Sequence, residues 1–198
     1  MALLLSVLEQ GMIYGILALG VYITYKILDF PDLTVDGSFP FGAAITVRLI
    51  NGFGVPAILT LPIAFLGGAL VGICTGLIHV KLKVRDLLSG IIMMTGLYTV
   101  NLWVAGPRYV AIFDKENIFN NSFVNSITPG FLVNFKNVII IFLITMVAKY
   151  LLDWYMSTKS GFLLRAVGDN DTIVTSLGVD KGLVKIVGLS IANGLVSL

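Results

Sequence analysis

The feature that most constrains this sequence is a long stretch, from Leu49 to Val80, that contains no Asp, Glu, Lys or Arg. One transmembrane helix needs about 20 apolar residues, so this stretch can cross a bilayer. A second uncharged stretch runs from Leu87 to Ala105. The chain is 12% charged, with a mean hydropathy of +0.97, whereas soluble domains carry about 25% charged residues. We therefore predict a membrane protein that crosses the bilayer several times.

The remaining hydrophobic segments bring the expected fold to an all-α bundle of about six spans, in one transmembrane domain over residues 1–198. The first span is predicted from Val7 to Leu28, where Gly11 and Gly15 have a spacing that allows close helix contact. Another is predicted to end at Met156. The apolar segment from Ile186 to Leu198 is only about two-thirds of a span, so we expect the protein to continue beyond it, truncated here at its C-terminus.

The second hydrophobic segment combines polar residues with helix breakers. Gly37, Pro40 and Gly42 disfavour a regular helix, and Asp36 would lie near or within the bilayer. Irregular backbone at membrane depth needs protein or a water-filled cavity around it, and broken helices often build transport sites. We predict a discontinuous second helix facing the bundle interior. Its candidate pathway residues are Thr34, Asp36, Gly37 and Ser38.

Two questions about this segment stay open at the level of sequence. The polar groups could line a solute pathway, or they could only satisfy a broken backbone. Asp29, Asp32 and Asp36 are spaced so that one helix face could hold all three carboxylates. The simpler expectation is that Asp29 and Asp32 are solvated at the interface and only Asp36 lies inside.

Lys and Arg residues are unevenly divided between the two ends of the predicted spans. Alternating spans place nine on one side and four on the other, and the richer side is expected to be cytoplasmic. The N-terminus and the polar stretch from Gly106 to Lys136 would then lie outside. The nine are Lys26, Lys81, Lys83, Arg85, Lys149, Lys159, Arg165, Lys181 and Lys185.

Residues 157–180 form a predicted cytoplasmic segment with two short helices. Gly168 is expected to interrupt the first helix, Asn170 or Asp171 to cap the second, and Gly178 to end it. Three apolar residues fall on one face at helical spacing: Ile173, Val174 and Leu177. We expect this face to be exposed and to dock on another protein or on the membrane surface.

This segment resembles the ATPase-coupling loop of bacterial ABC importer permeases of the branched-chain amino acid and ribose type. The matching positions are Gly161, Arg165, Ala166, Gly168, Asn170, Leu177 and Gly178. Val174 and Thr175 depart from the pattern, because relatives commonly carry Ala and then a basic residue. A glycine-rich first span before a broken polar helix is also similar. The run from Leu33 to Ser38 resembles the branch thought to import aromatic or related amino acids.

The resemblance implies a multi-pass permease subunit of an ATP-driven importer that moves a small organic nutrient, an amino acid, across the cell membrane. It implies three partners: a cytoplasmic ATP-binding subunit, an extracellular substrate-binding lipoprotein and a second permease copy in a homodimer. The chain has no Walker motif, so ATP hydrolysis is expected on the partner and no enzyme activity here. The implied coupling residues are Gly161, Arg165, Gly168, Ile173, Val174, Leu177 and Gly178.

Other functions have less support in the sequence. A net charge of +2 provides no basic face for nucleic acid. Cys74 and His79 lie in an apolar run without the partners that catalysis or metal binding would need, so no cofactor is expected. An ion-coupled secondary transporter remains the alternative, with Asp36 as its intramembrane ionisable group. A membrane enzyme or a plain channel is disfavoured by the coupling-like loop.

Overall fold

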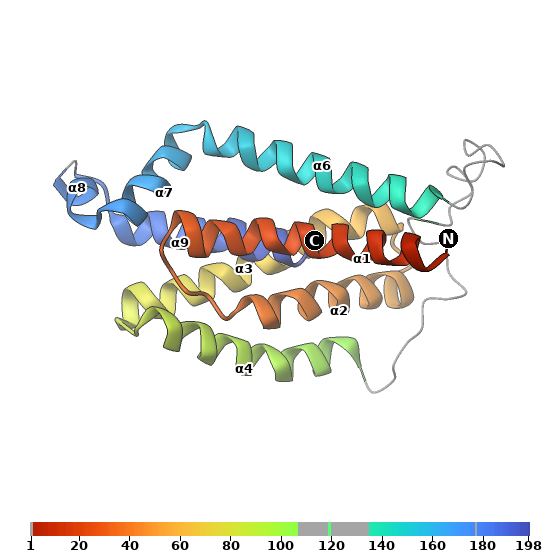
Figure 1. Cartoon of the computed structure of the whole chain (residues 1–198). Helices are drawn as coiled ribbons and strands as arrows, with labels where there is room; N and C mark the ends of the chain where they lie inside the picture. The colour runs from red at the N-terminus through yellow and green to blue at the C-terminus, as the bar shows by residue number, and fades with distance from the viewer. Residues whose placement is uncertain (1, 107–118, 120–134, 177) are drawn as a thin grey trace.

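The computed structural model describes residues 2–106, 119, 135–176 and 178–198, and these parts contain helices but no strands. Four helices are long and apolar enough to cross a membrane, at Leu3–Ile27, Ala57–Lys81, Asp86–Ala105 and Lys136–Met156. The helices run roughly along one common direction (Figure 1). Most of the polar stretch predicted between Gly106 and Lys136 lies outside the described residues.

The N-terminal helix and the one after it are joined by an irregular linker. Helix α1 (Ala2–Tyr22) continues into a π-helix, η1 (Ile23–Ile27), and α2 (Val35–Phe53) begins only after residues 28–34. The predicted break at Gly37, Pro40 and Gly42 is wrong, because α2 runs through all three. The interruption lies earlier, in the linker.

Local contacts explain why these three residues do not break α2. Pro40 lies in the second turn of α2, where its missing N–H leaves only the Asp36 carbonyl without its usual donor. A Cβ at Gly37 would lie 2.9 Å from Leu97 Cδ1, and one at Gly42 would collide with the carbonyl oxygen of Ser197. Both glycines are therefore positions of close helix approach.

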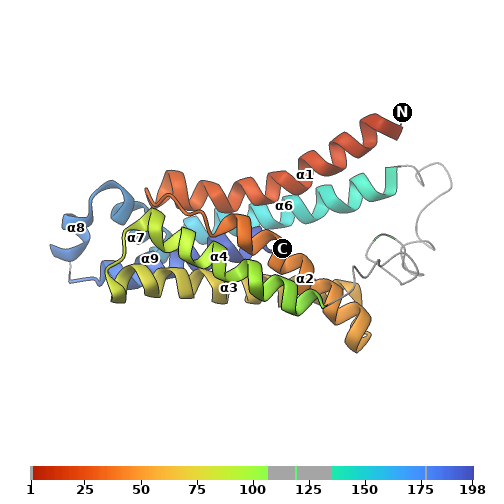
Figure 2. The same cartoon turned by 90° about the horizontal axis from the view of Figure 1, so that it is seen from below.

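The long uncharged stretch is divided by a turn. Gly54, with φ of 64°, follows the end of α2, and α3 (Ala57–Leu82) begins after Pro56. After a short turn comes α4 (Asp86–Ala105), and α6 (Lys136–Met156) lies beside α1 (Figure 2). The sequence located these apolar segments but not the turn at Gly54.

Helix α9 (Lys181–Val196) lies in the interior of the bundle, against α1, α2 and α3. A row of glycines on α3 allows its backbone to approach α9 closely: Gly68 meets Asn193, Gly72 meets Leu189 and Gly76 meets Ile186. The GxxxG pair of α1 behaves differently. A Cβ at Gly11 would have no atom within 4 Å. The spacing of small residues alone therefore did not identify which row makes a contact.

Two short helices, α7 (Lys159–Asp169) and α8 (Asp171–Ser176), lie at the end of the bundle that also holds the α3–α4 turn (Figures 1 and 2). The prediction that Gly168 interrupts the first helix is wrong, because α7 runs through Gly168 and ends before Asn170. Asn170 Oδ1 accepts a hydrogen bond from the Thr172 amide at 3.0 Å, which confirms its capping role. Gly178 has φ of 75°, as expected for a helix stop.

Candidate functional site

Asp32, in the linker before α2, is buried. The residue is only 2% exposed. Asp32 Oδ1 accepts a hydrogen bond from the Thr34 amide at 2.8 Å, and Oδ2 accepts one from Asn193 Nδ2 at 2.8 Å. The expectation that Asp32 is solvated is therefore wrong, although Asp29 is exposed. The linker is not helical, so the three carboxylates do not share one helix face.

Asn193 connects Asp32 to a wider buried network. Ser38 Oγ donates to Asn193 Oδ1 and also approaches the Thr34 carbonyl at 3.1 Å. The hydroxyls of Thr34 and Thr75 are 3.1 Å apart. The network thus joins the linker, α2, α3 and α9. Two of the predicted pathway residues, Thr34 and Ser38, are fully buried and have their polar groups satisfied within it.

Helix α4 closes one side of this network through a glycine. A Cβ at Gly90 would lie 2.8 Å from the Leu33 amide nitrogen and 3.3 Å from Asp32 Oδ1. Such distances leave no room for a larger side chain without displacing the linker. Gly90 therefore allows α4 to pack directly against the segment that carries Asp32.

Asp36 occupies a different environment, in a groove of about 330 Å³ between α2 and α4. The residue is exposed, and its carboxylate has no hydrogen bond or ion pair with any residue that the structure describes. The described residues lining the groove are Asp36, Gly37, Pro40, Met94, Thr95, Tyr98 and Asn101. No Lys, Arg or His is among them, so the groove carries one negative charge.

The groove lies at the middle of the α4 span. Gly37 packs against Met94 and Leu97, which lie near the centre of the 20 residues of α4. A helix of this length extends about 30 Å, the thickness of the hydrocarbon core. A charged side chain facing lipid at that depth costs about 2.5 to 3.5 kcal/mol. Asp36 therefore belongs on a surface that faces water or protein.

The groove also contains hydrogen-bond acceptors, from the Asn101 side chain and from the main-chain carbonyl of Asp36, which Pro40 leaves without its usual donor. Asn101 Nδ2 donates to the Gly37 carbonyl at 3.1 Å, which leaves Oδ1 as an acceptor. That buried oxygen has no partner among the described residues. Pro40 supplies no N–H to the Asp36 carbonyl. The groove is therefore lined by acceptors around a carboxylate, an arrangement that suits a cation or a donor-rich group.

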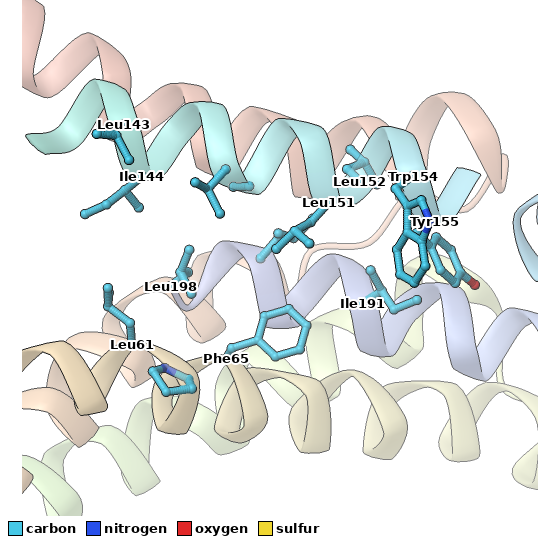
Figure 3. Close-up of a pocket in the computed structure, with 14 residues that line it drawn as sticks. Leu61, Phe65, Leu143, Ile144, Leu151, Leu152, Trp154, Tyr155, Ile191 and Leu198 are labelled. Atoms are coloured by element: carbon cyan, nitrogen blue, oxygen red, sulfur yellow. The ribbon is translucent and has the colours of Figure 1, made fainter. Parts of the chain in front are cut away.

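A larger cavity of about 520 Å³ lies between α3, α6 and α9 (Figure 3). Its lining is aliphatic and aromatic, and Leu151, Phe65 and Ile191 point into it from three helices. It contains no ionisable side chain apart from the phenol of Tyr155 at its edge. Because a charged solute would lose its hydration there without gaining a partner, the cavity is a poor candidate for a polar substrate.

The structure also shows what holds His79 and excludes a metal cluster in its described part. His79 Nδ1 lies 2.9 Å from the Val84 carbonyl and 3.4 Å from Asp86 Oδ1, and its ring packs edge-on against Phe30. These contacts fasten the α3–α4 turn to the linker. No group of three or more His, Cys, Asp or Glu residues in the described ranges could hold a metal ion.

The predicted coupling segment is only partly exposed. Val174 is fully buried and joins the core formed with Leu164 and Val167 of α7, so its predicted exposure is wrong. The short helix α8 packs against α7 and α9, which supply the apolar surface that sequence reasoning did not foresee. The side chain of Ile173 and the whole of Leu177 lie outside the described residues.

Two of the three predicted glycines of this segment are positions of close approach. A Cβ at Gly161 would lie 2.6 Å from the Tyr155 carbonyl, and one at Gly168 would collide with the Ile27 carbonyl. The outward face of α7 carries Arg165, exposed and without an ion pair among the described residues, and Phe162, which is 62% exposed. The sequence analysis did not identify Phe162 as an exposed residue, because an apolar side chain is normally expected in the core.

Comparison with known proteins now gives the family. Residues 3–195 match the family described as the permease component of the branched-chain amino acid transport system. The chain belongs to this family. The resemblance found in the Gly161–Gly178 segment is therefore confirmed at the level of the family, a family of membrane permeases, and the described residues include several apolar spans.

Individual relatives come from distant organisms. The chain is 41% identical over 196 residues to a tyrosine transport system permease protein of Clostridioides difficile, covering 98% of this chain and 62% of the relative. It is 27% identical over 184 residues to a probable branched-chain amino acid transport permease of Methanocaldococcus jannaschii, covering 88% and 58%. A ribose import permease of Haemophilus influenzae is 24% identical over 196 residues, covering 98% and 58%. The chain thus spans about three-fifths of the length of these relatives. No solved structure matches it.

Proposed function

We propose that the protein is the permease subunit of an ATP-driven importer of an amino acid, with tyrosine or a related aromatic amino acid as substrate. The observation that carries this proposal is the unpaired Asp36 carboxylate at mid-span depth in a permease-family chain. The Clostridioides difficile relative, named for tyrosine transport, supports the choice of substrate. Among the four predicted pathway residues, Asp36 and Gly37 face the groove, and Thr34 and Ser38 hold it in place.

The proposed assembly contains two permease copies, a cytoplasmic ATP-binding subunit and an extracellular substrate-binding lipoprotein. In this assembly α2 and α9 cross the membrane together with the four apolar spans, giving about six spans. The interruption at residues 28–34 makes the first two helices a discontinuous pair. The clustering of α7, α8 and the Lys81–Arg85 turn at one end of the bundle supports a cytoplasmic location for that end.

The outward surface of α7 and α8 is the proposed contact with the ATP-binding subunit. The buried faces of both helices are anchored on the permease itself through Val174, Leu164 and Val167. A firmly anchored pair can transmit force, and its exposed side, with Arg165 and Phe162, remains available to a partner groove. Leu177 belongs to the same proposed contact on sequence grounds.

Uptake by the reconstituted complex tests the main proposal. The full-length permease is reconstituted in liposomes with its ATP-binding subunit and binding protein. These liposomes should accumulate labelled tyrosine only when ATP is present on the side of the membrane where the ATP-binding subunit lies. Uptake driven by an ion gradient without ATP would favour the ion-coupled secondary transporter, for which a mid-depth carboxylate such as Asp36 is also expected. Absence of tyrosine uptake under both conditions would refute both.

Orientation and coupling have separate tests. Single cysteines at Lys83 and at Asn121, a position outside the described residues, should label from opposite sides of intact cells.

Arg165→Glu should release the ATP-binding subunit during purification while the permease stays folded, with Lys159→Glu at the start of the same helix as a control. Val174→Asp should instead lower the yield of folded permease, because that residue is buried. Retention of the ATP-binding subunit by both Arg165→Glu and Leu177→Asp would exclude this surface.

A further inference from the structure

We infer that the Asp36 groove is a water-filled part of the transport pathway that binds the ammonium group of the amino acid through the Asp36 carboxylate. This inference rests on the proposed function and specifies which part of the substrate this site takes. The charge of the groove is negative, as an ammonium group requires, since its described lining contains one carboxylate and no cationic side chain. Its capacity of about 330 Å³ is within the range of small-molecule sites.

The chemistry around Asp36 selects an amine over a carboxylate. A carboxylate accepts hydrogen bonds only, and an ammonium offers three donors. The neighbouring Asn101 Oδ1 has no hydrogen-bond partner among the residues that the structure describes, so it can accept a further donor once its side chain rotates. Tyr98, which is 68% exposed and lines the same groove, offers a ring face to an aromatic or cationic group.

The basic residues on the helices that form the groove lie far from Asp36. The apolar helices α3 and α4 carry their basic residues only at their ends, at Lys81, Lys83 and Arg85. Arg48 of α2 lies twelve residues after Asp36, about 18 Å along the helix. Lipid is excluded by the cost of an unpaired charge at that depth. Water and a cationic solute can therefore serve as partners of this carboxylate.

The outward face of α4 supports an aqueous groove. Thr95, Gly96, Tyr98 and Thr99 form an exposed section of small and polar residues at mid-helix, between the exposed apolar residues Ile91, Ile92, Val100 and Leu102. A lipid-facing surface favours large apolar side chains, whereas small and polar residues gather where a helix lines protein or water. This part of α4 therefore continues the polar surface that begins at Asp36.

Thiol labelling tests the groove without requiring transport. In the full chain with Cys74→Ala, a T95C variant should react with water-soluble methanethiosulfonates. The cationic reagent should react about five- to tenfold faster than the anionic one, because the negative charge of Asp36 in the same groove changes the two rates in opposite directions. Asp36→Asn should reduce this ratio to near one. Asp29→Asn is the matched control and should leave it unchanged, since Asp29 is exposed outside the groove and its φ of 50° suits Asn.

Ligand protection identifies the group that binds. Tyramine, which keeps the amine of tyrosine and lacks its carboxylate, should slow labelling of T95C, and 3-(4-hydroxyphenyl)propanoate, which lacks the amine, should not. Asp36→Asn should abolish the difference. Absence of labelling by either reagent, or equal protection by the two compounds, would overturn the inference. Failure of ATP-driven uptake would refute the proposed function alone, because these rates are measured without ATP.

Discussion

Asp32 and Asp36 are four residues apart and carry the same functional group, yet they lie in opposite environments. Asp32 is buried, and both of its oxygens accept hydrogen bonds, from the Thr34 amide and the Asn193 side chain. Asp36 is exposed in a groove, with no partner among the described residues. The first carboxylate holds the helices together, and the second is available to a ligand.

The difference between them arises from the linker. If residues 28–36 formed a helix, a separation of four would place both carboxylates on one face. Because the helix begins only at Val35, Asp32 turns toward α9 and Asp36 toward α4. The interruption therefore separates a structural carboxylate from an accessible one, and stability and transport should respond to different substitutions.

The largest expected effect is a loss of stability when the hydrogen bonds of the buried Asp32 are removed. Asn193→Leu removes the donor to Asp32 Oδ2 and the acceptor of the Ser38 hydroxyl, leaving a buried carboxylate with only one hydrogen bond. Loss of one partner of a buried charge costs about 3 kcal/mol, so the variant should unfold markedly more easily in detergent, measured by denaturant or thermal unfolding. Asp36→Asn should stay within about 0.5 kcal/mol of the parent. Equal losses would show that the two sites are not distinct.

Two glycines of α4 provide the next comparison. Gly90→Ala forces a Cβ against the Leu33 amide and should cost about 2 kcal/mol through overpacking. Gly96→Ala, six residues later, would place its Cβ with no described atom within 4 Å and should be neutral or stabilising by up to about 1 kcal/mol through helix propensity. Thermal unfolding of the two variants measures the contrast. A stable Gly90→Ala would show that α4 does not depend on its contact with the linker.

On the accessible side, the expected effect is on transport. Asp36→Asn should lower tyrosine uptake at least about tenfold, equivalent to about 1.4 kcal/mol, at normal expression and unchanged stability. Asp36→Glu should retain part of the activity because it keeps the charge. The exposed Asp29→Asn serves as the control. Normal uptake by Asp36→Asn would remove this residue from the pathway.

The smallest effect distinguishes two hydroxyls. Ser38→Ala removes a buried donor to Asn193 and should cost about 1 kcal/mol. Thr95→Ala removes a hydroxyl that donates only to carbonyls of its own helix, at Ile91 and Ile92, and should change stability by less than about 0.5 kcal/mol. Unfolding curves for both variants, recorded under the same conditions, test this. A larger loss of stability for Thr95→Ala than for Ser38→Ala would show that Thr95, and not Ser38, contributes to the buried packing.

Features that depend on local sequence were predicted well. The uncharged runs located the apolar spans, because hydrophobic length is sufficient to define a membrane crossing. Asn170 and Gly178 were identified as a cap and a stop, because capping involves only neighbouring backbone groups. Helix α9, by contrast, was predicted only as an incomplete final span from Ile186 to Leu198.

Features that depend on distant partners could not be read from the chain. Val174 is buried by α7 and α9, Asp32 is held by a residue 161 positions away, and Pro40 is accommodated within α2 because the helix began only five residues earlier. Asn193 gave a faint signal, as an amide within an apolar segment, but no sequence pattern names its partner. Composition and spacing determined that the chain enters the membrane as helices. Tertiary packing alone decided which polar groups those helices enclose and which they leave open, since each choice depends on surfaces brought together by folding.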